Sequence, residues 1–88
     1  MRAARAARKA GAKRVLALVT HGLFMPGAEA ALRDPAIDRI LVTDSVPAFR
    51  LGASDVQEKI DTIAVAPLLA EAVRRLHAGE TLSDLLVF

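Results

Sequence analysis

The stretch from Val15 to Phe24, VLALVTHGLF, most constrains what this chain can fold into. Five apolar residues run directly into Thr20, His21 and Gly22, and basic residues precede them. A short apolar run bounded in this way is typical of a strand that is buried on both faces of a parallel sheet. The polar residues then lie at the carboxyl end of the strand, which is the edge where open α/β sheets bind ligands.

The rest of the chain repeats this pattern of an apolar strand that ends in polar residues. The second strand ends in Thr43-Asp44-Ser45, and the third runs to Ala66-Pro67, where proline suits the first turn of a helix. Strands that alternate with helices predict an α/β fold with a parallel sheet. We predict helices over 1–10 with a cap at Gly11, over 28–33, and from 66 to a cap at Gly79. We predict strands within 15–24 and over 37–43 and 60–65, and an extended loop over 46–59.

Composition excludes several classes of protein. The chain has 88 residues, which suffice for one small domain or part of one, and 53% of them are hydrophobic. It contains no cysteine, so a disulfide framework and a thiolate metal site are both excluded. No apolar run approaches the roughly 18 residues of a membrane span, and the N-terminus lacks the apolar centre of an export signal. We expect a cytoplasmic protein that has no membrane partner.

The formal net charge of +2 is unevenly distributed, because six basic residues precede the first acid, Glu29. Clustered basic residues can attract nucleic acid. However, Arg2, Arg5 and Lys9 recur at helical spacing opposite alanines, and no aromatic residue lies among them to stack on bases. A solvated helix face is therefore favoured over a nucleic-acid interface.

Two residues at the predicted strand ends are candidates for chemistry. His21 is suited to general acid or base catalysis or to hydrogen bonding with phosphate, but it can equally hold its own loop through the backbone. Asp44 is suited to orienting a substrate, although Thr-Asp-Ser also fits a simple turn. Nothing in their spacing argues for a metal site formed by both residues. His77 is expected on the exposed side of a helix.

Three segments carry a resemblance to a known family: GAKRVLALVTHGLF, ILVTDSVP and IAVAPLLAEAVRRLHAGETLSDLL. In this order and spacing they resemble the C-terminal portion of ribose-phosphate pyrophosphokinase, also called phosphoribosyl pyrophosphate synthetase. The resemblance implies that residues 1–88 are part of a type I phosphoribosyltransferase-like domain, a three-layer sandwich around a parallel sheet. It also implies the family's reaction, which transfers diphosphate from ATP to ribose 5-phosphate with Mg²⁺ and supplies nucleotide biosynthesis.

The resemblance places the ribose-phosphate loop and the ATP-binding residues upstream of Met1, together with further strands and an N-terminal domain. We therefore expect Met1 to correspond to a position inside a longer gene. The isolated chain is expected to be inactive, with no cofactor of its own. Its expected partners are a second copy or a full-length homologue. The alternative is a non-catalytic interaction or oligomerisation module.

The end of the chain corresponds to a segment that, in the family, lines a site for phosphate and ADP between subunits. Thr81 and Ser83 keep hydroxyl groups that can donate to phosphate oxygens. Asp84 adds a negative charge, and Leu86 stands where the family has Phe. The alternative interpretation is that Thr81 caps a short turn, so that Leu82, Leu85 and Leu86 can pack.

Overall fold

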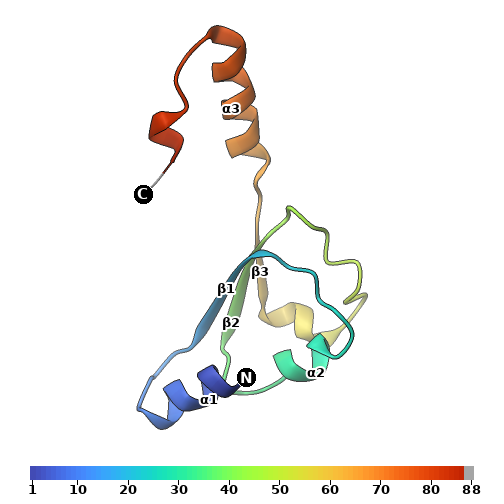
Figure 1. The fold of residues 1–88 in the computed structure, drawn as a ribbon. Helices are drawn as coiled ribbons and strands as arrows, with labels where there is room; N and C mark the ends of the chain where they lie inside the picture. The colour runs from blue at the N-terminus through green and yellow to red at the C-terminus, as the bar shows by residue number, and fades with distance from the viewer. Residues whose placement is uncertain (87–88) are drawn as a thin grey trace.

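The computed structural model describes residues 1–86 and shows a three-stranded parallel sheet with three α-helices (Figure 1). The strands are β1 (Leu16–His21), β2 (Arg39–Thr43) and β3 (Ile60–Ile63), in the order β1-β2-β3. The α-helices are α1 (Arg2–Lys9), α2 (Ala28–Leu32) and α3 (Ala66–Ala78). The α/β class and the parallel sheet are confirmed.

Two short 3₁₀ helices complete the described structure. The first, η1 (Asp55–Lys59), occupies the end of segment 46–59, for which the sequence predicts an extended loop. Its N-terminus is capped because the Ser54 hydroxyl accepts a hydrogen bond from the Val56 N–H at 3.3 Å. The second, η2 (Ser83–Leu85), follows α3.

Glycines end two of the helices as the sequence predicts. Gly11 has a φ of +101°, and the Ala12 N–H donates to the Ala7 carbonyl, which is the bonding pattern of a Schellman motif. Gly79 ends α3 with a φ of +72°. Glycine adopts these left-handed conformations without the strain that a Cβ would cause.

The core lies on one face of the sheet. Its centre is Ala4 of α1, Ile40 of β2, and Ala36 and Ile37 just before β2, with Leu32 of α2 packed against them. Val42 is buried on the same side of β2 as Ile40, since alternate strand residues share a face. Helices α1 and α2 therefore hold the amino-terminal half of the sheet.

The prediction that the first strand is buried on both faces is wrong for residues 1–86. Along β1 only Ala17 is half-buried, and the side chain of Leu18 is 73% exposed. The reason is that α1 and α2 pack on the face that carries Ile40, whereas α3 projects past the carboxyl ends of the strands (Figure 1). The opposite face of the sheet is therefore left open.

Two arginines of α1 form ion pairs with carboxylates in the segment that precedes β2. Arg5 pairs with Asp34 at 2.6 Å, and Arg8 pairs with Asp38 at 2.5 Å. Arg5 is nevertheless 71% exposed, as a solvated helix face predicts. These two cations have carboxylate partners within the chain.

Candidate functional site

The site starts from an irregularity in β1. The pairing of β1 with β2 shifts register between Val19 and His21, which leaves Thr20 without a direct partner on β2. Such a bulge releases a backbone group from the ladder. The Thr20 carbonyl instead accepts hydrogen bonds from the hydroxyls of Thr43 and Ser45, the latter at 3.1 Å.

His21 joins these hydroxyls at the carboxyl edge of the sheet, as its position in the sequence predicts. Its Nδ1 lies 2.6 Å from the Ser45 Oγ, which in turn lies 2.8 Å from the Thr43 Oγ1. A hydroxyl carries one proton, so Ser45 can donate to the Thr20 carbonyl and accept from an Nδ1–H of His21. The cluster of Thr20, His21, Thr43 and Ser45, here called the edge cluster, ties the ends of β1 and β2 together.

Asp44 lies beside β3 and has a different set of partners. Its N–H donates to the Ile63 carbonyl at 3.0 Å, and its Oδ1 accepts from the Val65 N–H at 2.9 Å. Asp44 therefore hydrogen bonds to both ends of the short connection between β3 and α3, through its backbone N–H and its carboxylate. This geometry is that of a side chain that fixes a turn, while a role in orienting substrate stays a prediction.

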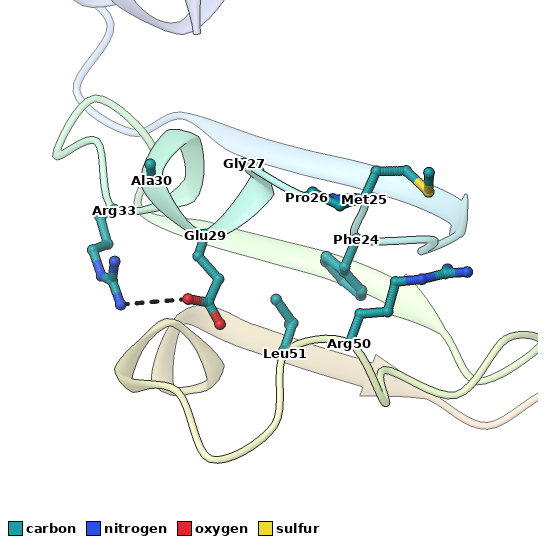
Figure 2. Close-up of a pocket in the computed structure, with 9 residues that line it drawn as sticks. All are labelled: Phe24, Met25, Pro26, Gly27, Glu29, Ala30, Arg33, Arg50 and Leu51. Atoms are coloured by element: carbon teal, nitrogen blue, oxygen red, sulfur yellow. Dashed lines mark ion pairs between the residues drawn. The ribbon is translucent and has the colours of Figure 1, made fainter.

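A cavity of about 530 Å³ lies between α2 and the loop that follows β2 (Figure 2). Two arginines reach it, and both have partners: Arg33 pairs with Asp55 at 2.8 Å and Glu29 at 3.7 Å, and Arg50 donates to the Leu23 carbonyl at 2.9 Å. The Arg33 guanidinium lowers the pKa of the Asp55 carboxyl through its hydrogen bonds. The residues that line the cavity are Phe24, Met25, Pro26, Gly27, Glu29, Ala30, Arg33, Arg50 and Leu51.

Sequence reasoning did not find this cavity. Arg33 and Arg50 are 17 positions apart, and nothing in the sequence pattern brings them together. The only available signal was the Pro26-Gly27 turn, which positions the start of α2 through a Gly27 φ of +91°. That turn contains no phosphate-binding motif, so the signal was not informative.

The hydroxyls of Thr81 and Ser83 lie together at the end of the chain, 2.8 Å apart, and the Thr81 Oγ1 accepts from the Ser83 N–H at 3.1 Å. Arg75 of α3 pairs with Asp84 and also donates to the Thr81 carbonyl at 3.3 Å. Arg75 therefore compensates the negative charge that Asp84 adds. An anion site here stays a prediction.

Glu71 completes the ion-pair network between α3 and the end of the chain. Arg74 and then Arg75 hydrogen bond to its carboxylate and lower the pKa of Glu71 to about 2. Arg74 also pairs with Glu80 at 2.9 Å. Arg74, Arg75 and Glu71 of α3 therefore all have ion-pair partners within the chain, and two arginines face three carboxylates.

The parallel sheet, with a polar cluster where β1 and β2 end, defines an α/β domain. In open sheets of this class, ligands commonly bind where the strands end. A family model described as "Phosphoribosyl synthetase-associated domain" matches residues 1–87. Because the match covers nearly the whole sequence, the chain belongs to this family, as the resemblance of its three segments predicts.

Curated relatives are named as ribose-phosphate pyrophosphokinases or, in one case, as a protein associated with phosphoribosyl pyrophosphate synthase. The chain is 45% identical over 76 residues to ribose-phosphate pyrophosphokinase 4 of Saccharomyces cerevisiae, covering 85% of this chain and 22% of the relative. It is 39% identical over 83 residues to a ribose-phosphate pyrophosphokinase of Rhodopirellula baltica, covering 94% of this chain and 25% of the relative. It is 34% identical over 87 residues to human phosphoribosyl pyrophosphate synthase-associated protein 2, covering 94% of this chain and 22% of the relative. The chain therefore spans about a quarter of the length of these relatives.

Within residues 1–86, the side chains do not form a site that fits the Mg²⁺ that the family resemblance implies. Mg²⁺ needs oxygen ligands, usually carboxylates, and residues 1–86 contain no group of three or more potential ligand side chains. Asp44 is the carboxylate at the edge of the sheet, and one of its oxygens already accepts from a backbone N–H. Arginine ion pairs engage Glu29, Asp34, Asp38, Asp55, Asp61, Glu71, Glu80 and Asp84.

None of the helices within residues 1–86 is long and apolar enough to cross a lipid bilayer.

Proposed function

We propose that this chain forms the C-terminal portion of a ribose-phosphate diphosphokinase, which transfers diphosphate from ATP to ribose 5-phosphate. The observation that carries the proposal is the family match over residues 1–87, joined by 39% identity over 83 residues to a relative of that name. In this role the chain supplies half of a phosphoribosyltransferase-like domain, and the rest of that domain would cover the face of the sheet that is open here.

We further propose that the isolated chain does not catalyse this transfer. Diphosphoryl transfer depends on metal ions that bridge the phosphates and on positioned donors around them. The proposal is supported by the carboxylates of residues 1–86, which are mostly held in arginine ion pairs and form no group of three or more potential metal ligands.

A chimera tests the first proposal directly. The 83 residues that match in the Rhodopirellula baltica relative are replaced by this chain, and AMP release is followed with ATP, Mg²⁺ and ribose 5-phosphate. The chimera is expected to turn over, whereas the 88-residue chain alone is not. A chimera that folds and binds ATP but releases no AMP would refute the proposed role, and AMP release by the chain alone would refute its inactivity.

Within this proposal, each candidate site residue is assigned a role. His21 is assigned to the edge cluster as a residue that positions the ends of β1 and β2, and Asp44 to the exit of β3. Thr81 and Ser83 are assigned to binding of phosphate or of the phosphates of ADP. Titration of each ligand into the labelled chain is expected to shift the amide signals of Thr81 to Ser83. An absence of shifts at millimolar ligand would leave only the turn-capping role.

A second candidate function is a non-catalytic module that associates with copies of itself or with a full-length homologue. The observation that favours it is the exposure of large apolar side chains on both β1 and α3. The name of the human relative, a synthase-associated protein, agrees with such a role. Pull-down of the Rhodopirellula baltica relative by this chain tests it, and failure of the chain to associate with itself or with that relative would remove this candidate.

A further inference from the structure

Two apolar surfaces of this chain have no partner within residues 1–86. The first is the open face of the sheet, formed by Leu16, Leu18, Leu41 and Ile63, of which Leu18 is 73% exposed. The second is a stripe along α3, formed by Leu68, Leu69, Val73 and Leu76, of which Val73 is 65% exposed. We call them the open sheet face and the α3 stripe.

The chain exposes more surface than a compact protein of its size. Its accessible surface is 6499 Å², whereas a folded monomer of 9.3 kDa exposes about 5,000 Å² by the usual scaling with mass. Its radius of gyration is 16.7 Å, against about 12 Å for a compact chain of 88 residues. The surplus reflects the separation of α3 from the sheet (Figure 1).

The size of this surplus corresponds to a stable dimer. Burial of about 1,500 Å² from each of two chains gives about 3,000 Å², within the range of obligate homodimer interfaces. The two elements that carry these surfaces, α3 and β1, also match in length. The 13 residues of α3 span about 20 Å, and so does a six-residue strand such as β1.

The charges that border the two surfaces allow them to be buried together. On the open sheet face, Arg39 of β2 pairs with Asp61 of β3. On α3, Arg74 and Arg75 pair with Glu71 on the side opposite the α3 stripe. Docking of the stripe onto the sheet would leave none of these charges without a partner, so the usual penalty for a buried unpaired charge is avoided.

Asp44 directs α3 away from its own sheet. Its N–H donates to the Ile63 carbonyl at 3.0 Å and its carboxylate accepts from the Val65 N–H at 2.9 Å, on both sides of Ala64. The connection between β3 and α3 is therefore held in an extended direction beyond the strand ends (Figure 1). A helix held outside its own domain favours exchange with an identical partner, since each copy has both surfaces.

We propose that two copies of this chain form a symmetric dimer in which the α3 stripe of each copy lies on the open sheet face of the other. This inference rests on association, the second candidate function. It selects a second copy as the partner and adds the two surfaces that meet. Sedimentation analysis over micromolar concentrations is expected to give twice the 9.3 kDa mass. Val73→Glu is expected to give a monomer, while Ala78→Glu, on the opposite side of α3, stays dimeric.

Disulfide trapping identifies the surfaces that meet. Because the chain has no native cysteine, only the introduced cysteines can form a disulfide. A Leu18→Cys chain is mixed under mild oxidation with chains that carry Leu69→Cys, Val73→Cys or Leu76→Cys. At least one mixture is expected to give mixed covalent dimers in high yield. Arg2→Cys on α1 replaces Leu18→Cys as the control and is expected to give few.

Three results would overturn the proposal. One is a wild-type monomer at 100 micromolar, and another is a dimer in which none of the three mixtures crosslinks above the Arg2→Cys control. The third is a Leu18→Cys/Val73→Cys double variant that closes a disulfide within one chain, since this would place α3 on its own sheet. A monomer that still captures the Rhodopirellula baltica relative would refute the second-copy dimer and leave association as a function.

Discussion

Arg8 of α1 and Asp38, just before β2, form an ion pair with 2.5 Å between the Nη2 and Oδ2 atoms. The same Oδ2 accepts a hydrogen bond from the Val15 N–H at 2.7 Å, and the Asp38 N–H donates to the Val15 carbonyl at 2.9 Å. One carboxylate therefore joins α1, the start of β1 and the start of β2.

Asp38→Asn is expected to lower the melting temperature at neutral pH. It is also expected to make the melting temperature fall less steeply as the pH is lowered. The Val15 N–H, and then Arg8, hold the pKa of the Asp38 carboxyl below its usual range. A lowered folded pKa stabilises the fold above about pH 4, the unfolded value, and this contribution is lost as the pH falls through the folded pKa. Melting temperatures from pH 7 to pH 2 are expected to converge for the two proteins. A difference in melting temperature between the two proteins that stays constant with pH would contradict this explanation. Glu58→Gln is the control variant.

Gly22→Ala is expected to lower the free energy of unfolding by about 1–3 kcal/mol through overpacking. A Cβ at this position would lie 2.6 Å from the Val42 Cγ2 and 2.7 Å from the Phe24 Cε2. Urea denaturation measures the loss. If the clash with Val42 is its cause, the added effect of Gly22→Ala in a Val42→Ala background is smaller; an equal effect in both backgrounds points elsewhere.

Lys59→Met is expected to lower the free energy of unfolding by about 1–3 kcal/mol, because partly buried carbonyls lose a charged donor. The Lys59 Nζ donates to the carbonyls of Leu32, Asp34 and Ile37 at 3.0–3.2 Å. Denaturant unfolding provides the measurement. The matched control is Lys9→Met on exposed α1, expected to change stability by less than about 0.5 kcal/mol. Equal losses in both variants would show that the carbonyl contacts contribute little.

Ser45→Ala tests the edge cluster. Removal of the hydroxyl takes one partner from His21 Nδ1 and one from the Thr20 carbonyl, at an expected cost of about 0.5–1.5 kcal/mol. The ring signals of His21 in NMR spectra are expected to shift at the same time. Ser83→Ala at the end of the chain is the control, and unchanged His21 signals in Ser45→Ala would argue against the 2.6 Å contact.

The sequence by itself predicted the features that depend on local geometry. The apolar runs before His21 and Thr43 indicated strands that end together, and the structure pairs these two residues in a parallel sheet. Gly11 and Gly79 indicated helix ends, because only glycine adopts a positive φ without strain. The family was also indicated by local information, because each segment that resembles ribose-phosphate pyrophosphokinases consists of residues that are close together in the chain.

Only the tertiary structure decided which surfaces are covered and which polar groups meet. The apolar pattern of β1 predicted burial on both faces, but burial depends on what packs against a strand, and α3 projects away from it. Ser45 meets His21 from 24 positions away, and Lys59 reaches carbonyls 22 to 27 positions away. Such contacts follow from the path of the backbone in space, on which a local sequence pattern carries no information.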